Sequence, residues 1–203
     1  DRIFWPSSPS AGPNDYTENW DTDINGDMHS WSMWNEGANI EMCHIEKPRF
    51  ASEFGFQSFP SLSTAKSFTP DEDWNITSPT FEHHQKSTIG TVSTLENFAR
   101  YFRFPTSFEN MLYLSQAQQA WAIESAIVYW RSQMPYCMGT LFWHLNDMWP
   151  GSSCSSIEYS GKWKPLQYDA RRFYSELVPL LFIEKGKLYV YVANDTQNDE
   201  EVD

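Results

Sequence analysis

A carboxylate at the end of a short apolar strand is the first residue in this chain that could carry out chemistry. Phe50 and Ala51 are apolar, Glu53 follows them, and Gly55 lets the backbone turn away. A carboxylate at the carboxyl end of a strand, followed by a glycine turn, is where barrel enzymes carry catalytic groups. Taken alone, Glu53 could equally be a solvated surface charge. Its aromatic neighbours and a second motif downstream favour a role in a site.

That second motif is rich in tryptophan and polar side chains. It runs over 139–150 as GTLFWHLNDMWP and continues over 155–165 as SSIEYSGKWKP. Together with RFASEFGFQS over 49–58, these segments resemble the C-terminal half of the catalytic domain of the beta-mannosidases in glycoside hydrolase family 2. The resemblance extends through nearly the whole chain and is specific in these blocks. Between them it depends mainly on spacing.

The resemblance implies a role for several residues. Glu53 matches the nucleophile of the family, which attacks the anomeric carbon and forms a covalent glycosyl-enzyme. Trp143 resembles the tryptophan that forms the floor of the sugar pocket, with the hydrophobic core as the alternative. Three more residues resemble the cluster on the sixth strand that lines the same pocket: His29, Trp31 and Trp34. His29 could donate to a sugar hydroxyl or to Glu53, or it could be purely structural.

Two polar residues after Trp143 are further candidates. Asn146 and Asp147 could bind sugar hydroxyls, although Asp147 could equally order its own loop. The sequence favours no metal site, because its adjacent histidines lack ligand spacing and its cysteines form no zinc pattern. We expect no cofactor, and we expect the three cysteines to be buried free thiols.

The general acid of the family ends an Asn-Glu pair on the fourth strand, and the chain contains Asn35-Glu36. A barrel unit of one strand and one helix takes about 31 residues, and two full units separate strands four and seven. Glu36 lies too close to Glu53 in the chain to hold even one unit between them. We therefore interpret Glu36 as a decoy in the loop after the sixth strand, with the true acid before Asp1. Such a chain alone should be inactive.

Composition sets limits on the partners. The chain has 203 residues, a net charge of −13 and ten tryptophans. The acidic surface argues against binding to nucleic acid or to an anionic membrane, and no apolar run approaches the ~20 residues of a membrane span. The start at Asp1, without methionine, reads as the middle of a longer protein. Two triplets, at Asn75 and Asn194, fit the glycosylation pattern and leave a lysosomal or secreted location open.

The elements expected around these residues alternate between strand and helix. Short strands are expected at Ile3–Trp5, Asp27–Trp31, Arg49–Glu53 and Met138–Trp143, and residues 59–93 read as a long irregular excursion. One helix is expected from Thr94 to Phe102. The strongest runs from Ser107, a plausible N-cap, to about Arg131. Such a series implies parallel strands with helices outside.

The predicted fold class is α/β: the C-terminal half of a (β/α)8 TIM barrel followed by the first strands of an immunoglobulin-like β-sandwich. The barrel half is assigned to residues 1–174 and the truncated sandwich to 175–203. A hairpin over 181–192, with its turn at Lys185-Gly186, would open that second domain. In this interpretation the rest of the parent polypeptide is an obligatory partner.

The function that the resemblance implies is a retaining exo-glycosidase acting on terminal beta-D-mannosides, in oligosaccharides or glycan-derived disaccharides. Two alternatives remain open. A related family 2 enzyme could act on galactosides, glucuronides or glucosaminides. A non-catalytic carbohydrate-binding fragment would use the same aromatic residues without cleaving the sugar.

Overall fold

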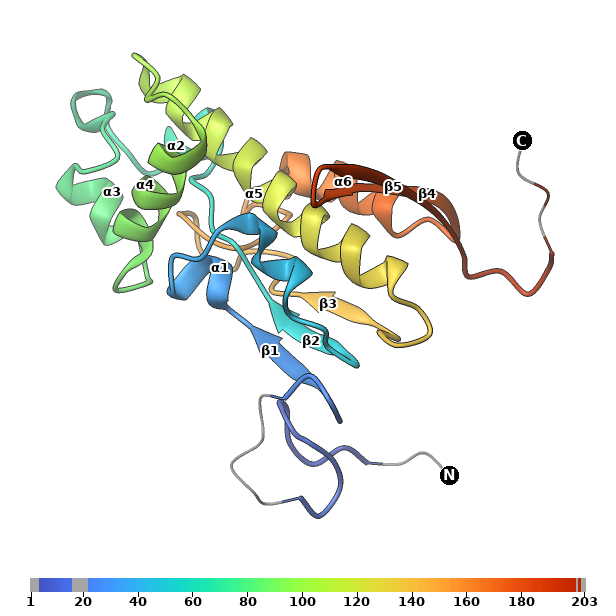
Figure 1. Cartoon of the computed structure of the whole chain (residues 1–203). Coiled ribbons are helices and arrows are strands. Elements are labelled where there is room, and N and C mark those ends of the chain that lie inside the picture. The colour runs from blue at the N-terminus through green and yellow to red at the C-terminus, as the bar shows by residue number, and fades with distance from the viewer. Residues whose placement is uncertain (1–3, 16–21, 200, 202–203) are drawn as a thin grey trace.

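The computed structural model describes residues 4–15, 22–199 and 201, and it contains a three-stranded parallel sheet and a two-stranded antiparallel sheet. Figure 1 shows the long helix α5 crossing the parallel sheet, with the hairpin on the far side of that helix. The elements in chain order are β1 (Met28–Ser30), α1 (Ser32–Asn35), the 3-10 helix η1 (Ile40–His44), β2 (Ala51–Phe54), α2 (Leu62–Ala65), the 3-10 helix η2 (Asp71–Asp73), α3 (Pro79–His83), α4 (Gly90–Tyr101), α5 (Phe108–Ser132), β3 (Thr140–Phe142), α6 (Pro165–Phe173), β4 (Leu177–Glu184) and β5 (Lys187–Asn194).

The parallel sheet has the order β1-β2-β3, so β2 is its central strand. His29 pairs with Glu53 across β1 and β2, and Phe54 pairs with Phe142 across β2 and β3. The prediction of parallel strands near these positions is confirmed, although each strand is shorter than expected. The register shifts between Met28 and His29 in the first pair of strands and between Ala51 and Phe54 in the second. At these shifts the side chains no longer alternate strictly between the two faces of the sheet.

Helix α5 covers one face of this sheet. Its N-cap is Ser107, whose hydroxyl accepts a hydrogen bond from the backbone N–H of Asn110 at 3.2 Å. The helix predicted from Ser107 to about Arg131 is therefore confirmed. Phe54 of β2 is fully buried and meets Trp130 of α5 edge to face, with ring centroids 4.9 Å apart. This aromatic contact lies at the centre of the core between sheet and helix.

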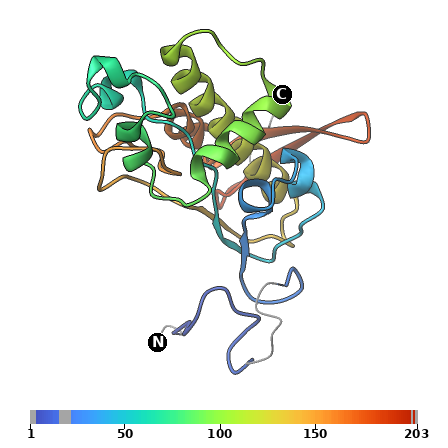
Figure 2. The same ribbon diagram turned by 90° about the vertical axis from the view of Figure 1, so that its left-hand side faces the viewer.

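The excursion between β2 and α5 forms a second core around the N-terminal half of α5. Residues 59–93 are mostly irregular, as predicted, but they also contain short helices that the sequence analysis did not expect. The helix expected from Thr94 to Phe102 is confirmed as α4, although it begins at Gly90. Ser61 and Ser78 begin two of the short helices, because each hydroxyl accepts a backbone N–H three residues ahead. The aromatic rings of Phe59, Phe81 and Phe98 fill this second core. Figure 2 shows the excursion gathered at one end of the molecule.

The hairpin of β4 and β5 is confirmed, with its turn at the expected residues. Lys185 and Gly186 both have positive φ angles, 50° and 74°, as a tight two-residue turn requires. One face of the hairpin packs on α5 through Val178, Leu180 and Ala193. The other face is apolar and exposed, and it comprises Leu177, Leu181, Ile183, Leu188, Val190 and Val192.

The prediction of a strand at Ile3–Trp5 is wrong for its described residues. Ile3 lies outside the described residues, and Phe4 and Trp5 have no regular structure. Pro6 and Pro9 remove backbone donors from this segment, so it cannot form a regular ladder beside β1. It instead meets the start of β1 through an isolated bridge between Ser10 and Asp27 and through side-chain hydrogen bonds.

The exposed apolar face of the hairpin predicts that the 203-residue chain associates with itself in solution. Contiguous apolar surface and open strand edges both promote association. Replacing the cross-strand pair Leu181 and Val190 by Leu181→Glu and Val190→Lys should move association to several-fold higher protein concentration, because both side chains are more than half exposed. Light scattering against concentration measures this shift. A monodisperse unmodified chain with a sharp thermal transition would contradict the prediction.

Candidate active site

The carboxylate of Glu53 lies at the end of the central strand, next to two side chains from β1 and its following turn. The indole N–H of Trp31 donates a hydrogen bond of 2.9 Å to Glu53 Oε1. His29 Nδ1 lies 3.7 Å from the same oxygen, and the two side chains are 20% and 26% exposed. Among the described residues, no hydrogen bond reaches Oε2. One oxygen of Glu53 is therefore held, while the other is free to meet a ligand.

Gly55 allows the aromatic residues to approach this strand closely. A Cβ atom at Gly55 would lie 2.7 Å from the Trp31 ring and 2.8 Å from the Trp143 carbonyl oxygen. A residue with a side chain would push Trp31 away from Glu53. The glycine predicted to provide a turn therefore also provides space for the site.

The pairing of β2 with β3 places Trp143 beside the end of β2. Its backbone N–H donates to the carbonyl of Phe54 at 2.7 Å, directly after β3 ends. The peptide between Trp143 and His144 is cis. The Trp143 side chain is 49% exposed, so it is available for contact with a ligand, unlike a core tryptophan.

Trp34 is a correction, because the structure places it in the core. Its side chain is 2% exposed, and it packs edge to face on Phe56 with ring centroids 5.2 Å apart. The short helix α1 turns Trp34 away from the end of the sheet, whereas Trp31 precedes that helix and remains at the sheet. Spacing alone could not separate the two tryptophans. Glu36 follows α1 and is exposed.

Asp147 orders its own loop, which was the alternative left open by the sequence. Its Oδ2 accepts hydrogen bonds from the hydroxyls of Ser153 at 3.0 Å and Ser155 at 2.7 Å. His144 Nε2 lies 3.5 Å from Oδ1. Burial raises the pKa of Asp147, but its hydrogen bonds and the charge of Lys164 outweigh burial and hold that pKa below the ordinary value. Asn146 is exposed and remains available to a ligand.

A buried lysine, Lys164, stabilises this loop through hydrogen bonds. Lys164 is 1% exposed, and its Nζ donates to the hydroxyls of Ser58 at 3.1 Å and Ser153 at 3.3 Å. Burial lowers the pKa of Lys164, and the negative charges of Asp147 and Glu158 partly offset that effect. Glu158 is also buried and accepts hydrogen bonds from the Ser61 hydroxyl and from Gln116. No motif in the sequence predicted this network.

The sequence analysis also missed the carboxylate of Asp27, which directly precedes β1. Asp27 Oδ1 accepts hydrogen bonds of 2.9 Å from the Trp5 indole N–H and from the Ser10 backbone N–H. Asp27 Oδ2 accepts from the hydroxyls of Ser8, at 2.5 Å, and Ser52. Burial raises the pKa of Asp27, but these four donors outweigh it and keep that pKa below its ordinary value.

All three cysteines are free and buried, as predicted. Burial raises the pKa of the Cys154 thiol to about 12, and it raises the pKa of Cys43 and Cys137 as well. These thiols are not reactive groups in the site. Within residues 4–15, 22–199 and 201, there is no cluster of His, Cys, Asp and Glu that could hold a metal ion, and no helix long and apolar enough to cross a membrane.

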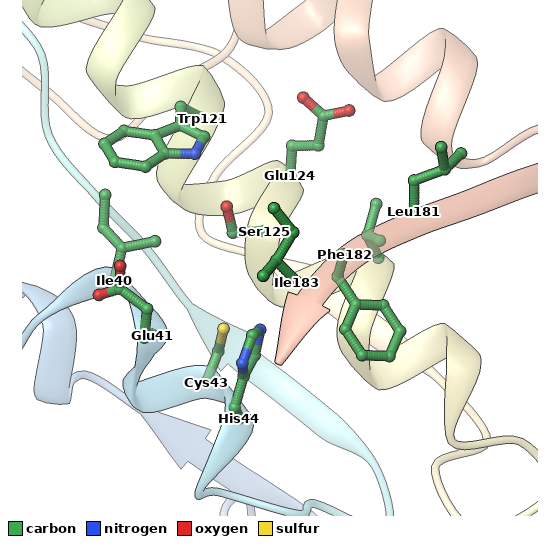
Figure 3. Close-up of a pocket in the computed structure, with 11 residues that line it drawn as sticks. Ile40, Glu41, Cys43, His44, Trp121, Glu124, Ser125, Leu181, Phe182 and Ile183 are labelled. Carbon is green, nitrogen blue, oxygen red and sulfur yellow. The ribbon is translucent and has the colours of Figure 1, made fainter. Parts of the chain in front are cut away.

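A cavity lies elsewhere, between η1, α5 and β4. It has a volume of about 470 Å³ and is lined by Cys43, His44, Trp121, Phe182 and their neighbours (Figure 3). None of its lining residues belongs to the predicted site. A smaller cavity of about 380 Å³ lies beside the sheet edge and is lined by Trp5, Ser8, Asp27 and Ser52, among others. This cavity borders the hydrogen-bond network of Asp27.

Comparison with known proteins gives the relatives of this chain. No protein-family model matches it. It is 35% identical over 219 residues to "Beta-mannosidase" of Capra hircus, in an alignment that covers 99% of this chain. It is 31% identical over 226 residues to "Beta-mannosidase A" of Emericella nidulans, in an alignment that covers 95% of this chain. A crystal structure of Beta-D-Mannosidase from Dictyoglomus thermophilum matches 95% of the chain with a TM-score of 0.88 and 32% identity. The chain spans about a quarter of the length of these relatives.

The Asp147 contacts predict a defined acid dependence of stability. Because its folded-state pKa is below the ordinary value of 3.8, Asp147 contributes stability that is fully present above that value and is lost as pH falls through the folded-state pKa. Asp147→Asn should therefore lower the free energy of unfolding by about 1–3 kcal/mol at pH 7. Urea unfolding of dilute protein, followed by tryptophan fluorescence, measures the difference.

That difference should shrink as the pH falls below 3.8. Asn146→Ala is the matched control, because the exposed Asn146 side chain bonds only a neighbouring carbonyl among the described residues. If the free energy of unfolding of Asp147→Asn stays below that of the unmodified protein by the same amount down to strongly acidic pH, the lowered pKa of Asp147 is contradicted.

Proposed function

We propose that this chain, a homologue of the beta-mannosidases over nearly its whole length, supplies the nucleophile half of the active site of a retaining glycoside hydrolase acting on terminal beta-D-mannosides. The observation that supports the proposal is that the two carboxylate oxygens of Glu53 have different hydrogen-bond partners. Its Oε1 is held by the Trp31 indole at the end of the central strand, and its Oε2 accepts no described hydrogen bond. This arrangement suits a carboxylate that attacks a carbon atom.

In the proposed first step, Glu53 Oε2 forms a bond to the anomeric carbon of the mannoside. The bond from that carbon to the leaving oxygen breaks, and an acid/base carboxyl group protonates the departing alcohol. Water then attacks the same carbon and gives its proton to the acid/base group. The ester to Glu53 breaks, and the sugar leaves with its original configuration while both carboxyl groups return to their starting states.

We propose that four further side chains meet the sugar. Trp143, half exposed beside the strand end, would stack on the apolar face of the pyranose ring. Asn146 is exposed and would bind hydroxyls. Trp31 and His29 would line the wall next to Glu53, which they already contact. Trp34 and Asp147 are left out of the set, because both are engaged within the protein.

The finer fold assignment is part of the same proposal. The three parallel strands with α5 and α6 outside them would be the C-terminal half of a (β/α)8 barrel, over residues 1–174. The hairpin β4–β5 would open an immunoglobulin-like sandwich over 175–203. The acid/base carboxyl group would then precede Asp1. Glu36 is exposed and has no side-chain hydrogen bond or ion pair among the described residues, which supports its interpretation as a loop residue.

The same site could serve a related sugar, because galactosides, glucuronides and glucosaminides share the reacting centre. The names of the relatives favour mannosides. A carbohydrate-binding fragment without catalysis is the alternative for the 203-residue chain taken alone.

Hydrolysis of an aryl beta-mannoside tests the proposal. A protein extended upstream by the missing half of the barrel should cleave the substrate, and the 203-residue chain should not. In the extended protein, Glu53→Gln should lower kcat by roughly 10³-fold or more with little change in sugar binding, because only the attacking atom is lost. Steady-state kinetics and calorimetric binding separate the two effects.

Glu36→Gln is the matched control and should leave both parameters unchanged. Cleavage by the 203-residue chain itself would place the acid/base group within it and reinstate Glu36. If Glu53→Gln affects neither cleavage nor binding, Glu53 does not belong to the site.

A further inference from the structure

The hydrogen bonds around Asp27 determine where the proton of His29 resides. Ser8 Oγ lies 2.5 Å from Asp27 Oδ2 and 3.0 Å from His29 Nε2. A carboxylate is only an acceptor, so the single hydroxyl proton of Ser8 must point to Asp27. Ser8 can then offer His29 only a lone pair. Nε2 of His29 must therefore carry a proton.

The ionised state of Asp27 makes this argument firm. Four donors converge on its two oxygens: the Trp5 indole, the Ser10 amide and the hydroxyls of Ser8 and Ser52. They hold the pKa of Asp27 below its ordinary value against the effect of burial. A protonated Asp27 could donate to Ser8 and free its hydroxyl for His29, but that form is disfavoured above strongly acidic pH.

We propose that Asp27 and Ser8 are positioning residues that fix the neutral ring of His29 as the Nε2–H tautomer, so that a bare Nδ1 faces Glu53. Nδ1 lies 3.7 Å from Glu53 Oε1, which already receives the Trp31 N–H. The neutral histidine thus gives no proton to the nucleophile and leaves its charge available. The catalytic meaning of this tautomer depends on the proposed role of Glu53, whereas the tautomer itself does not.

The same arrangement limits where the ring of His29 can take up a second proton. A second proton can enter the ring only at Nδ1, which places a positive charge beside Glu53. Such an ion pair would stabilise the carboxylate and make it a weaker nucleophile. The charged groups that described interactions connect to His29 are Glu53, directly across from β1, and Asp27, through Ser8.

The Nε2–H tautomer can be observed without catalysis. In protein labelled with 15N at the histidine imidazoles, NMR of a sedimented sample distinguishes protonated from bare ring nitrogens, and His29→Gln identifies the signals. We expect Nε2 protonated and Nδ1 bare above neutral pH. Ser8→Ala should give a mixture of both tautomers, while Ser8→Thr, which keeps the hydroxyl, should restore the original state. A bare Nε2 in the unmodified protein would overturn the proposal.

Ser52→Ala is the matched control. Ser52 donates to the same Asp27 oxygen as Ser8, and its Oγ lies 3.2 Å from Ser8 Oγ, but it has no described contact with His29. It should leave the His29 tautomer unchanged. If Ser52→Ala and Ser8→Ala produce the same tautomer mixture, or if neither changes it, the path through Ser8 is wrong.

Kinetics of the extended protein provide the second readout. Ser8→Ala should lower kcat/KM about tenfold, and Ser8→Thr, which keeps the hydroxyl, should restore it. An unchanged kcat/KM in Ser8→Ala would contradict the positioning role of Ser8. If the tautomer behaves as expected but no beta-mannoside is cleaved, the proposed function fails and the tautomer assignment stands.

Discussion

The register between β1 and β2 is the constraint on which the site depends. Parallel pairing sets His29 opposite Glu53, and Trp31 follows on the same strand end. Helix α5 maintains this register, because Phe54 of β2 is buried against Trp130 and cannot move along the strand without leaving its place in the core. A shift of one residue would exchange the faces of β2 and turn Glu53 toward the helix. The packing of the core therefore determines the position of the carboxylate.

Local and periodic features of the fold could be predicted from the sequence. The apolar period of α5 with its Ser107 cap, the hairpin turn at Lys185-Gly186 and the positions of β1 to β3 all have signals within a few residues. The resemblance in the motifs added the candidate role of Glu53. These signals failed at Phe4 and Trp5, where apolar residues suggested a strand but the neighbouring prolines prevent regular pairing.

The polar surroundings of Glu53 could not be predicted in the same way. Ser8, Asp27 and Ser52 meet only in the folded chain, and hydrogen bonds between distant segments leave no period in the sequence. Trp31 and Trp34 look alike as residues, yet the single turn of α1 sends one to the nucleophile and the other into the core. Asp147 resembled a ligand for hydroxyls, and only the fold showed its donors, Ser153 and Ser155.

The three hydrophobic cores among the described residues all include α5. Its N-terminal part contributes Met111 and Leu112 to the core of the excursion, its middle and end contribute Ile123 and Trp130 to the core beneath the sheet, and Val128 meets the hairpin. None of these cores can open without stripping apolar surface from the same helix. The described part of the chain should thus behave as one cooperative folding unit, in which amides along α5 exchange their hydrogens only when the whole assembly opens. The hairpin, although the proposed domain boundary separates it from the parallel strands, would unfold together with them.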